Sequence, residues 1–160
     1  MPKIKLDAID RRILFALQKN ARIANVNLAE EVGLSASPCL RRVGLLEREG
    51  IIRGYHASLD RSALGFGLTV FVNVKVERHD DEAAEAFRAA IRVLPEVVTC
   101  HLVSGDADFL LQVVVPDLHA YERLLLGALL KAPGVRDIRS NIAIQTVKDQ
   151  PYLPLDRLTS

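Results

Sequence analysis

The sequence predicts an α+β protein of two parts, a helical N-terminal part and a C-terminal part that mixes strands with helices. Two observations predict this division. Through the first sixty of the 160 residues, apolar side chains recur at helical spacing between capping residues. From Phe66 onward, stretches that alternate between apolar and polar residues take turns with helical stretches, in an order that occurs twice.

Two helices are expected first in the N-terminal part. One covers about 8–19 and begins after Asp7, whose carboxylate can accept hydrogen bonds from the free N–H groups of the first turn. The next lies in NVNLAEEVG. There, Asn27 and Glu30 have the three-residue spacing of a capping box, and Asn25 is a competing cap.

A third helix follows after a tight turn and is capped by Ser35 or Ser37. Ala29 lets the second and third helices cross closely, and Gly33 supplies the turn, which together indicate a helix-turn-helix. A plain three-helix bundle is the alternative. The following IIRGYHA has a β-type composition that suits a wing. We therefore expect a winged helix-turn-helix domain over 1–61.

The C-terminal part, 68–160, is expected to be a ferredoxin-like βαββαβ sandwich, with 62–67 as a linker. A strand over 68–76 and a helix over 81–94 are followed by a second strand in DFLLQVVV and a second helix in DLHAYERLLLGALLK. An offset of 38 residues aligns the two units, including the Pro-x-Val that ends each helix. The second helix is apolar on nearly all sides, so it is either buried or a surface for self-association.

The composition excludes several classes of protein. It is 49% hydrophobic and 26% charged, as in soluble globular domains, and no segment has the length of a secretory or membrane-spanning stretch, so we expect a cytoplasmic protein. Two cysteines and four histidines lack the spacing of a disulfide framework or a metal site, and no cofactor motif is present. The first sixty residues contain ten Lys and Arg against seven Asp and Glu, which permits a nucleic-acid surface.

The third expected helix contains the candidate residues for DNA binding. Arg41 and Arg42 lie just past its first turn, the end that enters the major groove in a helix-turn-helix, and nearby hydroxyls suit phosphates or base edges. A solvated basic face is the alternative. The full expected set is Asn25, Ser35, Ser37, Pro38, Arg41 and Arg42.

The loop within LVSGDADFLL, residues 102–111, allows four interpretations. A catalytic carboxylate pair needs a nucleophile or acid-base partner that we do not find, so an enzyme is not expected. A metal site needs more oxygen ligands than Asp106 and Asp108 supply. A plain hairpin loop fits Gly-Asp turn chemistry, and a site for a small zwitterion fits backbone N–H groups beside a carboxylate. The residues alone leave the last two open.

Over nearly its whole length the chain resembles the Lrp/AsnC family of feast/famine regulators. The resemblance rests on LDAIDRRIL, NVNLAEEVGLSASPCLRRV, REGIIRGYHASLD and CHLVSGDADFLLQVVVPDLHAYERLLLGALLKAPGV. It implies a sequence-specific transcriptional regulator whose N-terminal domain binds double-stranded DNA. Its C-terminal domain would form homodimers, assemble further to octamers and respond to a small amino acid. A ligand-independent architectural DNA-binding protein is the alternative.

The resemblance also implies effector-binding residues. The loop contributes Gly105, Asp106, Ala107 and Asp108, and a looser match adds Asn141, Ile142 and Ala143. We expect Asp108, rather than Asp106, to bind the ligand ammonium. Close relatives commonly have Arg-Val-Arg-Arg-Leu-Glu in this helix, whereas this chain has Gly44-Leu45 in place of the two central arginines. The change removes two basic side chains. It also places a glycine inside the helix, which lowers helix stability by about 1 kcal/mol relative to alanine.

Overall fold

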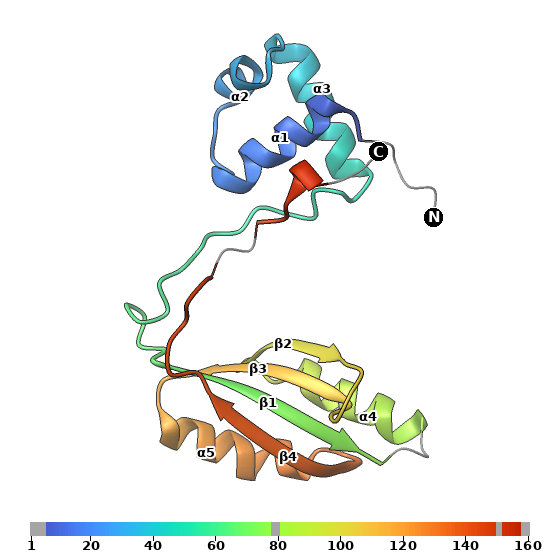
Figure 1. The fold of residues 1–160 in the computed structure, drawn as a ribbon, viewed down its shortest axis with the longest axis vertical. Coiled ribbons are helices and arrows are strands. Elements are labelled where there is room, and N and C mark those ends of the chain that lie inside the picture. Colours follow the sequence, from blue (N-terminus) through green and yellow to red (C-terminus); the bar gives the residue numbers. More distant parts are fainter. Residues whose placement is uncertain (1–5, 78–80, 150–151, 158–160) are drawn as a thin grey trace. The chain divides into compact units, whose positions relative to one another are not determined.

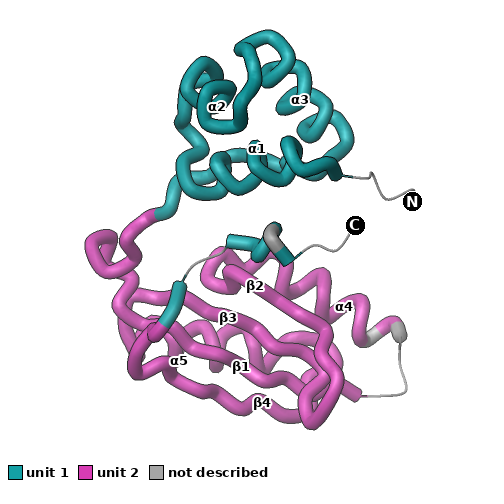
Figure 2. Tube along the Cα trace, turned by 45° about the horizontal axis from the view of Figure 1, so that its top comes forward, with its two compact units in different colours: residues 1–58, 148–160 teal, residues 59–147 magenta. Residues whose placement is uncertain are grey.

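The structure, a computed structural model, describes residues 6–77, 81–149 and 152–157. The chain forms two compact units, drawn in different colours in Figure 2: residues 1–58 with 148–160, and residues 59–147. The first unit is helical and the second is built on a β-sheet (Figure 1).

Four helical elements are described in the helical unit: α1 (Ala8–Lys19), α2 (Asn25–Val32), α3 (Ala36–Arg48) and the short 3-10 helix η2 (Leu155–Arg157). Asp7 caps α1 as expected. Its carboxylate accepts a hydrogen bond from the N–H of Asp10 (2.8 Å), and the Asp10 carboxylate accepts one from the N–H of Asp7 (3.1 Å). The expected capping box at Asn27 is wrong, because α2 already begins at Asn25.

The turn between α2 and α3 is the one that the sequence predicts. Gly33 adopts a left-handed conformation with φ of 73°, which favours glycine, and its N–H donates to the carbonyl of Ala29. Leu34 donates to the same carbonyl at 2.8 Å. Ala29 is buried at the crossing of the helices. These contacts form a helix-turn-helix.

The core of the helical unit includes one residue that we expected elsewhere. The buried residues of this core are Ile13, Leu14, Ala16, Leu28, Ala29, Val32, Cys39, Leu46 and Leu155. The sequence predicts a sandwich domain over 68–160, and by their contacts residues 148–160 group with the helices.

The segment after α3 contains no strand. The N–H groups of Ile51 and Ile52 donate to the carbonyl of Leu46, and residues 53–60 are neither helical nor extended in a sheet. The expected wing is therefore an irregular segment here. It is held at α3 by the hydroxyl of Tyr55, which donates to the Glu47 carboxylate at 2.8 Å.

The second unit has the expected ferredoxin-like topology. Its elements are β1 (Leu68–Val76), α4 (Asp81–Arg92), β2 (Val97–Leu102), β3 (Phe109–Val115), α5 (Leu118–Gly127), the 3-10 helix η1 (Leu129–Lys131) and β4 (Val135–Ile142). The strands are antiparallel in the order β2-β3-β1-β4. This order follows from two βαβ units interleaved in one sheet.

The two helices of this unit cover one face of the sheet. Alternate residues of β1, such as Val70, Val72 and Val74, are completely buried and pack with Phe87 of α4 and Leu124 of α5. The intervening residues of β1 lie on the opposite face, because side chains alternate along a strand. That face carries the polar side chains discussed below. No helix in the described part of the chain is long and apolar enough to cross a membrane.

Candidate functional site

The exposed face of α3 combines hydroxyl, basic and apolar groups. Ser37, Arg41 and Arg48 lie on it at helical spacing, while Cys39 and Leu46 are buried on the other side. Leu40 is 61% exposed beside Arg41. Leu40 and Arg48 lie on this face outside the expected DNA-binding set.

Arg42 lies next to this face but is bound within the unit. Its guanidinium donates to the carboxylates of Asp7 and Asp10, each at 2.7 Å, and its side chain is only 31% exposed. The N–H of Asp10 and then the Arg42 guanidinium lower the pKa of the Asp7 carboxyl, and hydrogen bonds to both carboxylates raise the pKa of Arg42. Arg42 thus ties α3 to the beginning of α1.

Asn25 also serves α3 from inside the unit. Its side-chain N–H donates to the carbonyl of Ala36 at 2.8 Å, in the first turn of α3. Ser35 caps α3 through its backbone only, and its hydroxyl is exposed. Pro38 is half-buried in the first turn. Of the expected DNA-binding set, Ser35, Ser37 and Arg41 are therefore exposed, while Asn25 and Arg42 make internal contacts.

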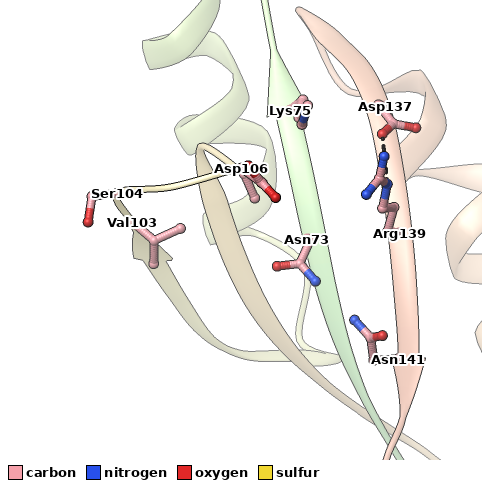
Figure 3. A pocket seen from close by; sticks show the side chains of 9 residues that line it. Asn73, Lys75, Val103, Ser104, Asp106, Asp137, Arg139 and Asn141 are labelled. Carbon is pink, nitrogen blue, oxygen red and sulfur yellow. Dashed lines mark ion pairs between the residues drawn. The ribbon is translucent and has the colours of Figure 1, made fainter.

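A pocket of about 360 Å³ lies on the open face of the sheet, between the β2–β3 loop and strands β1 and β4 (Figure 3). Gly105 makes the loop possible, with φ of 125°. The pocket is lined by Asn73 and Lys75 of β1, Asp137, Arg139 and Asn141 of β4, and Val103, Ser104, Asp106 and Ala107 of the loop. Three of the expected effector residues, Asp106, Ala107 and Asn141, therefore meet in one pocket.

The charges of this pocket are only partly paired. The Nε of Arg139 lies 3.4 Å from a carboxylate oxygen of Asp137, as Figure 3 shows. Neither Lys75 nor Asp106 forms an ion pair with any residue that the structure describes. The pocket therefore offers one unpaired cation and one unpaired anion in the same space.

Asp108 has a different position from the one we expected. Its carboxylate accepts a hydrogen bond from the N–H of Val76 (3.0 Å), and its own N–H donates to the carbonyl of Val74 (3.0 Å). These bonds fasten the loop to β1. Asp106 lines the pocket on the open face, whereas one carboxylate oxygen of Asp108 is bonded to β1.

Two other expected residues do not line the pocket. The backbone N–H of Ala143 donates to the carbonyl of Thr69 at 3.0 Å, so this residue extends the pairing of β4 with β1. Ile142 pairs with Val70 and lies on the other side of the sheet from Asn141. Asn73, Lys75 and Arg139 also line the pocket and were not among the expected residues. The signal for them in the sequence is that polar residues occupy alternate positions along β1 and β4.

Comparison with known proteins decides the family. Residues 69–153 match the family model described as the Lrp/AsnC ligand binding domain, and residues 6–53 match a winged helix-turn-helix DNA-binding model. The chain belongs to the Lrp/AsnC family. It is 49% identical over 152 residues to the leucine-responsive regulatory protein of Salmonella typhimurium, and 48% identical to that of Escherichia coli K12, with 95% of this chain and 93% of each relative covered.

Solved structures agree with this assignment. A transcriptional regulator of Neisseria meningitidis in complex with L-Met superposes with a TM-score of 0.91 at 41% identity, covering 95% of this chain and 98% of that one. An AsnC family regulator from Agrobacterium tumefaciens also gives 0.91, at 38% identity, covering 96% and 100%. The expected family and fold class are confirmed, and this Lrp/AsnC protein is a DNA-binding regulator with a ligand-binding domain.

Proposed function

We propose that this Lrp/AsnC regulator binds double-stranded DNA with the exposed face of α3 and changes that binding when an α-amino acid occupies the pocket on the sheet. The observation that carries the proposal is the pair of unpaired opposite charges, Lys75 and Asp106, in a pocket of about 360 Å³ within the matched ligand-binding domain.

The DNA-binding face uses groups that suit both backbone and bases. Arg41 and Arg48 offer guanidinium groups to phosphates or guanine, and the hydroxyls of Ser35 and Ser37 offer further donors. Leu40, being exposed, suits contact with a thymine methyl group. Asn25 and Arg42 set the position of α3 from within the unit.

The pocket suits a free amino acid because such a molecule is a zwitterion. Lys75 and Asp106 both line the pocket, and in this proposal Lys75 binds the carboxylate and Asp106 the ammonium through charge-assisted hydrogen bonds. The amides of Asn73 and Asn141 supply additional donors and acceptors, and Val103 supplies an apolar contact. The related Neisseria regulator was solved in complex with L-Met, so L-methionine and L-leucine are the first ligands to test.

Self-association completes the proposal. Phe71 is 39% exposed on the open sheet face, and Leu118, Leu126 and Leu130 are exposed on and after α5. Apolar surface of this kind is commonly covered by a second copy. We propose a homodimer that assembles further, up to an octamer, in the cytoplasm, where its DNA is. The protein acts by binding, without catalysis or a cofactor.

The test combines two titrations of the full-length protein. Calorimetry with each of the twenty amino acids finds the ligand, and fluorescence anisotropy measures the affinity for an operator fragment with and without it. We expect at least one apolar amino acid to bind and to shift the DNA affinity by about 5-fold or more. DNA binding that no amino acid alters would favour the architectural, ligand-independent alternative.

A further inference from the structure

The segment that follows the sheet unit is bound to α1 by both polar and apolar contacts. The side chain of Gln18 accepts a hydrogen bond from the N–H of Leu153 (2.7 Å) and donates one to the carbonyl of the same residue (3.3 Å). Two residues later, Leu155 is only 8% exposed within the helical core. The neighbouring Tyr152 is 49% exposed, so burial is specific to Leu155.

These contacts make the segment part of the helical unit. One glutamine amide satisfies both the N–H and the C=O of Leu153, as a neighbouring strand would. Leu155 packs in the same core as Ile13 and Ala16 of α1. A loose terminal segment would not satisfy its backbone and bury a leucine at the same place.

In the sequence, the same segment follows the strand that lines the pocket after a short connection. Asn141 of β4 lines the pocket, and the N–H of Ala143 makes a further described hydrogen bond to β1. Only nine residues lie between Ala143 and Leu153, so the connection spans at most about 35 Å when fully extended. Docking on α1 is intramolecular, so the length of this connection limits the effective concentration of the segment.

At its other end, α1 holds the DNA-binding helix. Gln18 lies in the last turn of α1, and Asp7 and Asp10 lie at its beginning, where they bind Arg42 of α3. A helix of twelve residues is rigid over its length of roughly 18 Å. A displacement of α1 at Gln18 is therefore passed to α3 through Arg42.

We propose that residues 152–157 form a clip on α1, held by Gln18 and Leu155, through which the state of the effector pocket controls the position of α3. The ligand-dependent part of this inference rests on the proposed function. The ligand would act by favouring the state of β4 in which the clip is either docked or released, since it shifts an equilibrium only through differential affinity.

The experiment uses the full-length protein with Gln18→Ala and Leu155→Ala, and Tyr152→Ala as the matched control in the same segment. Hydrogen–deuterium exchange measures docking of 152–157. Calorimetry measures L-methionine and L-leucine binding, and anisotropy measures DNA affinity with and without each amino acid. Circular dichroism checks that each variant remains helical. Gln18→Ala leaves the apolar core intact, so the result for Gln18→Ala decides the question in the event that Leu155→Ala is unfolded.

We expect both clip variants to exchange about five- to tenfold faster in 152–157 than the wild type. They should bind the amino acid as the wild type does, within about twofold, while the ratio of DNA affinities with and without it falls to about one. Tyr152→Ala should behave as the wild type. The proposal would be overturned if a clip variant showed faster hydrogen–deuterium exchange in 152–157 but kept the wild-type ratio of DNA affinities with and without the amino acid. It would also be overturned if exchange in 152–157 were the same as in the wild type.

The proposed function can fail separately. If the wild type binds neither amino acid in calorimetry, the choice of effector is wrong. The clip is then tested by the DNA affinities of the variants alone. In that case Gln18→Ala must change the DNA affinity by about 5-fold or more, because the coupling of α1 to α3 needs no ligand. Equal DNA affinities for Gln18→Ala, Tyr152→Ala and the wild type would then overturn the clip.

Discussion

Replacing Arg42 by methionine is expected to destabilise the helical unit without removing a DNA contact. Methionine retains an unbranched apolar stem but cannot donate to Asp7 or Asp10, so both carboxylates lose a hydrogen bond of 2.7 Å. The neighbouring Arg41 provides the opposite case, because it is exposed and makes no ion pair with a described residue.

The magnitude follows from the exposure of the three side chains. A hydrogen bond to a charged group contributes about 1.5–3 kcal/mol when buried, and an exposed ion pair about 0–1 kcal/mol. Asp10 is 16% exposed and Asp7 48%, so most of the effect comes from Asp10. We expect a loss of about 2 kcal/mol, which lowers the unfolding temperature of a domain of this size by roughly 8–16 °C.

Two measurements separate the roles of the arginines. In thermal unfolding, Arg42→Met should show the full decrease and Arg41→Ala less than about 3 °C. In DNA titrations at several salt concentrations, Arg41→Ala should reduce the salt slope by about one, and Arg42→Met should leave it unchanged. This role of Arg42 would be refuted if Arg42→Met had an unaltered unfolding temperature and a reduced salt slope of DNA binding. Arg42 would then contact a DNA phosphate instead of holding α3 to α1.

The stability that Arg42 contributes through Asp7 and Asp10 should also depend on pH. The pKa of Asp7 is lowered in the folded state from its ordinary value of 3.8, first by the Asp10 N–H and then by Arg42. A lowered pKa gives stability that is present above the unfolded value and lost as the pH falls through the folded one. The difference in unfolding temperature between the wild type and Arg42→Met should therefore shrink below about pH 3.8.

The remaining predictions concern four single residues. Asp106→Asn should weaken amino-acid binding about ten- to a hundredfold in calorimetry. Asp108→Ala should mainly lower the unfolding temperature, because alanine cannot accept the hydrogen bond from the N–H of Val76. Gly44→Ala should stabilise α3 by about 1 kcal/mol in thermal unfolding, since an added Cβ would meet only a guanidinium nitrogen of Arg48, at 3.5 Å. Burial and then the hydrogen bond to Glu47 raise the pKa of Tyr55 to about 12. In an ultraviolet titration, the wild type should show a tyrosine that ionises near this pH, and Tyr55→Phe should lack it. Because the folded-state pKa is raised, the stability that this contact contributes should fall as the pH rises from 10 to 12.

The helix-turn-helix was predictable because its signals are local. The Asp7 cap lies within one turn of the residues that it serves, and Gly33 sets its turn by its own backbone conformation. Leu155 was not predictable in the same way. It packs with α1 across more than 130 residues of sequence, and one leucine in a short segment has no periodicity to analyse. Residues 51–57 form no strand in the structure, because β-type composition does not by itself provide a partner strand.

The candidate pocket was only half predictable for a related reason. The loop residue Asp106 stands out beside a glycine, and alternation in LTVFVNVKV places Asn73 and Lys75 on one face. That β4 lies beside β1, so that Arg139 faces Asn73, is a property of the strand order. Sequence spacing also does not show that Asp108, and not Asp106, accepts a hydrogen bond from the N–H of Val76. That contact depends on how the loop lies against β1.

Pairing within the fold separates the charged residues that hold this protein together from those available to a ligand. Arg42 and Asp108 are bonded to internal partners and are costly to remove, because removal leaves those partners unsatisfied. Arg41, Lys75 and Asp106 have no such partner among the described residues and remain hydrated while their surfaces are open. In the proposed function, each of the three gains a charge-assisted bond when DNA or an amino acid excludes that water. Neighbouring residues of the same type, Arg41 beside Arg42 and Asp106 near Asp108, therefore differ in whether the fold itself supplies a partner.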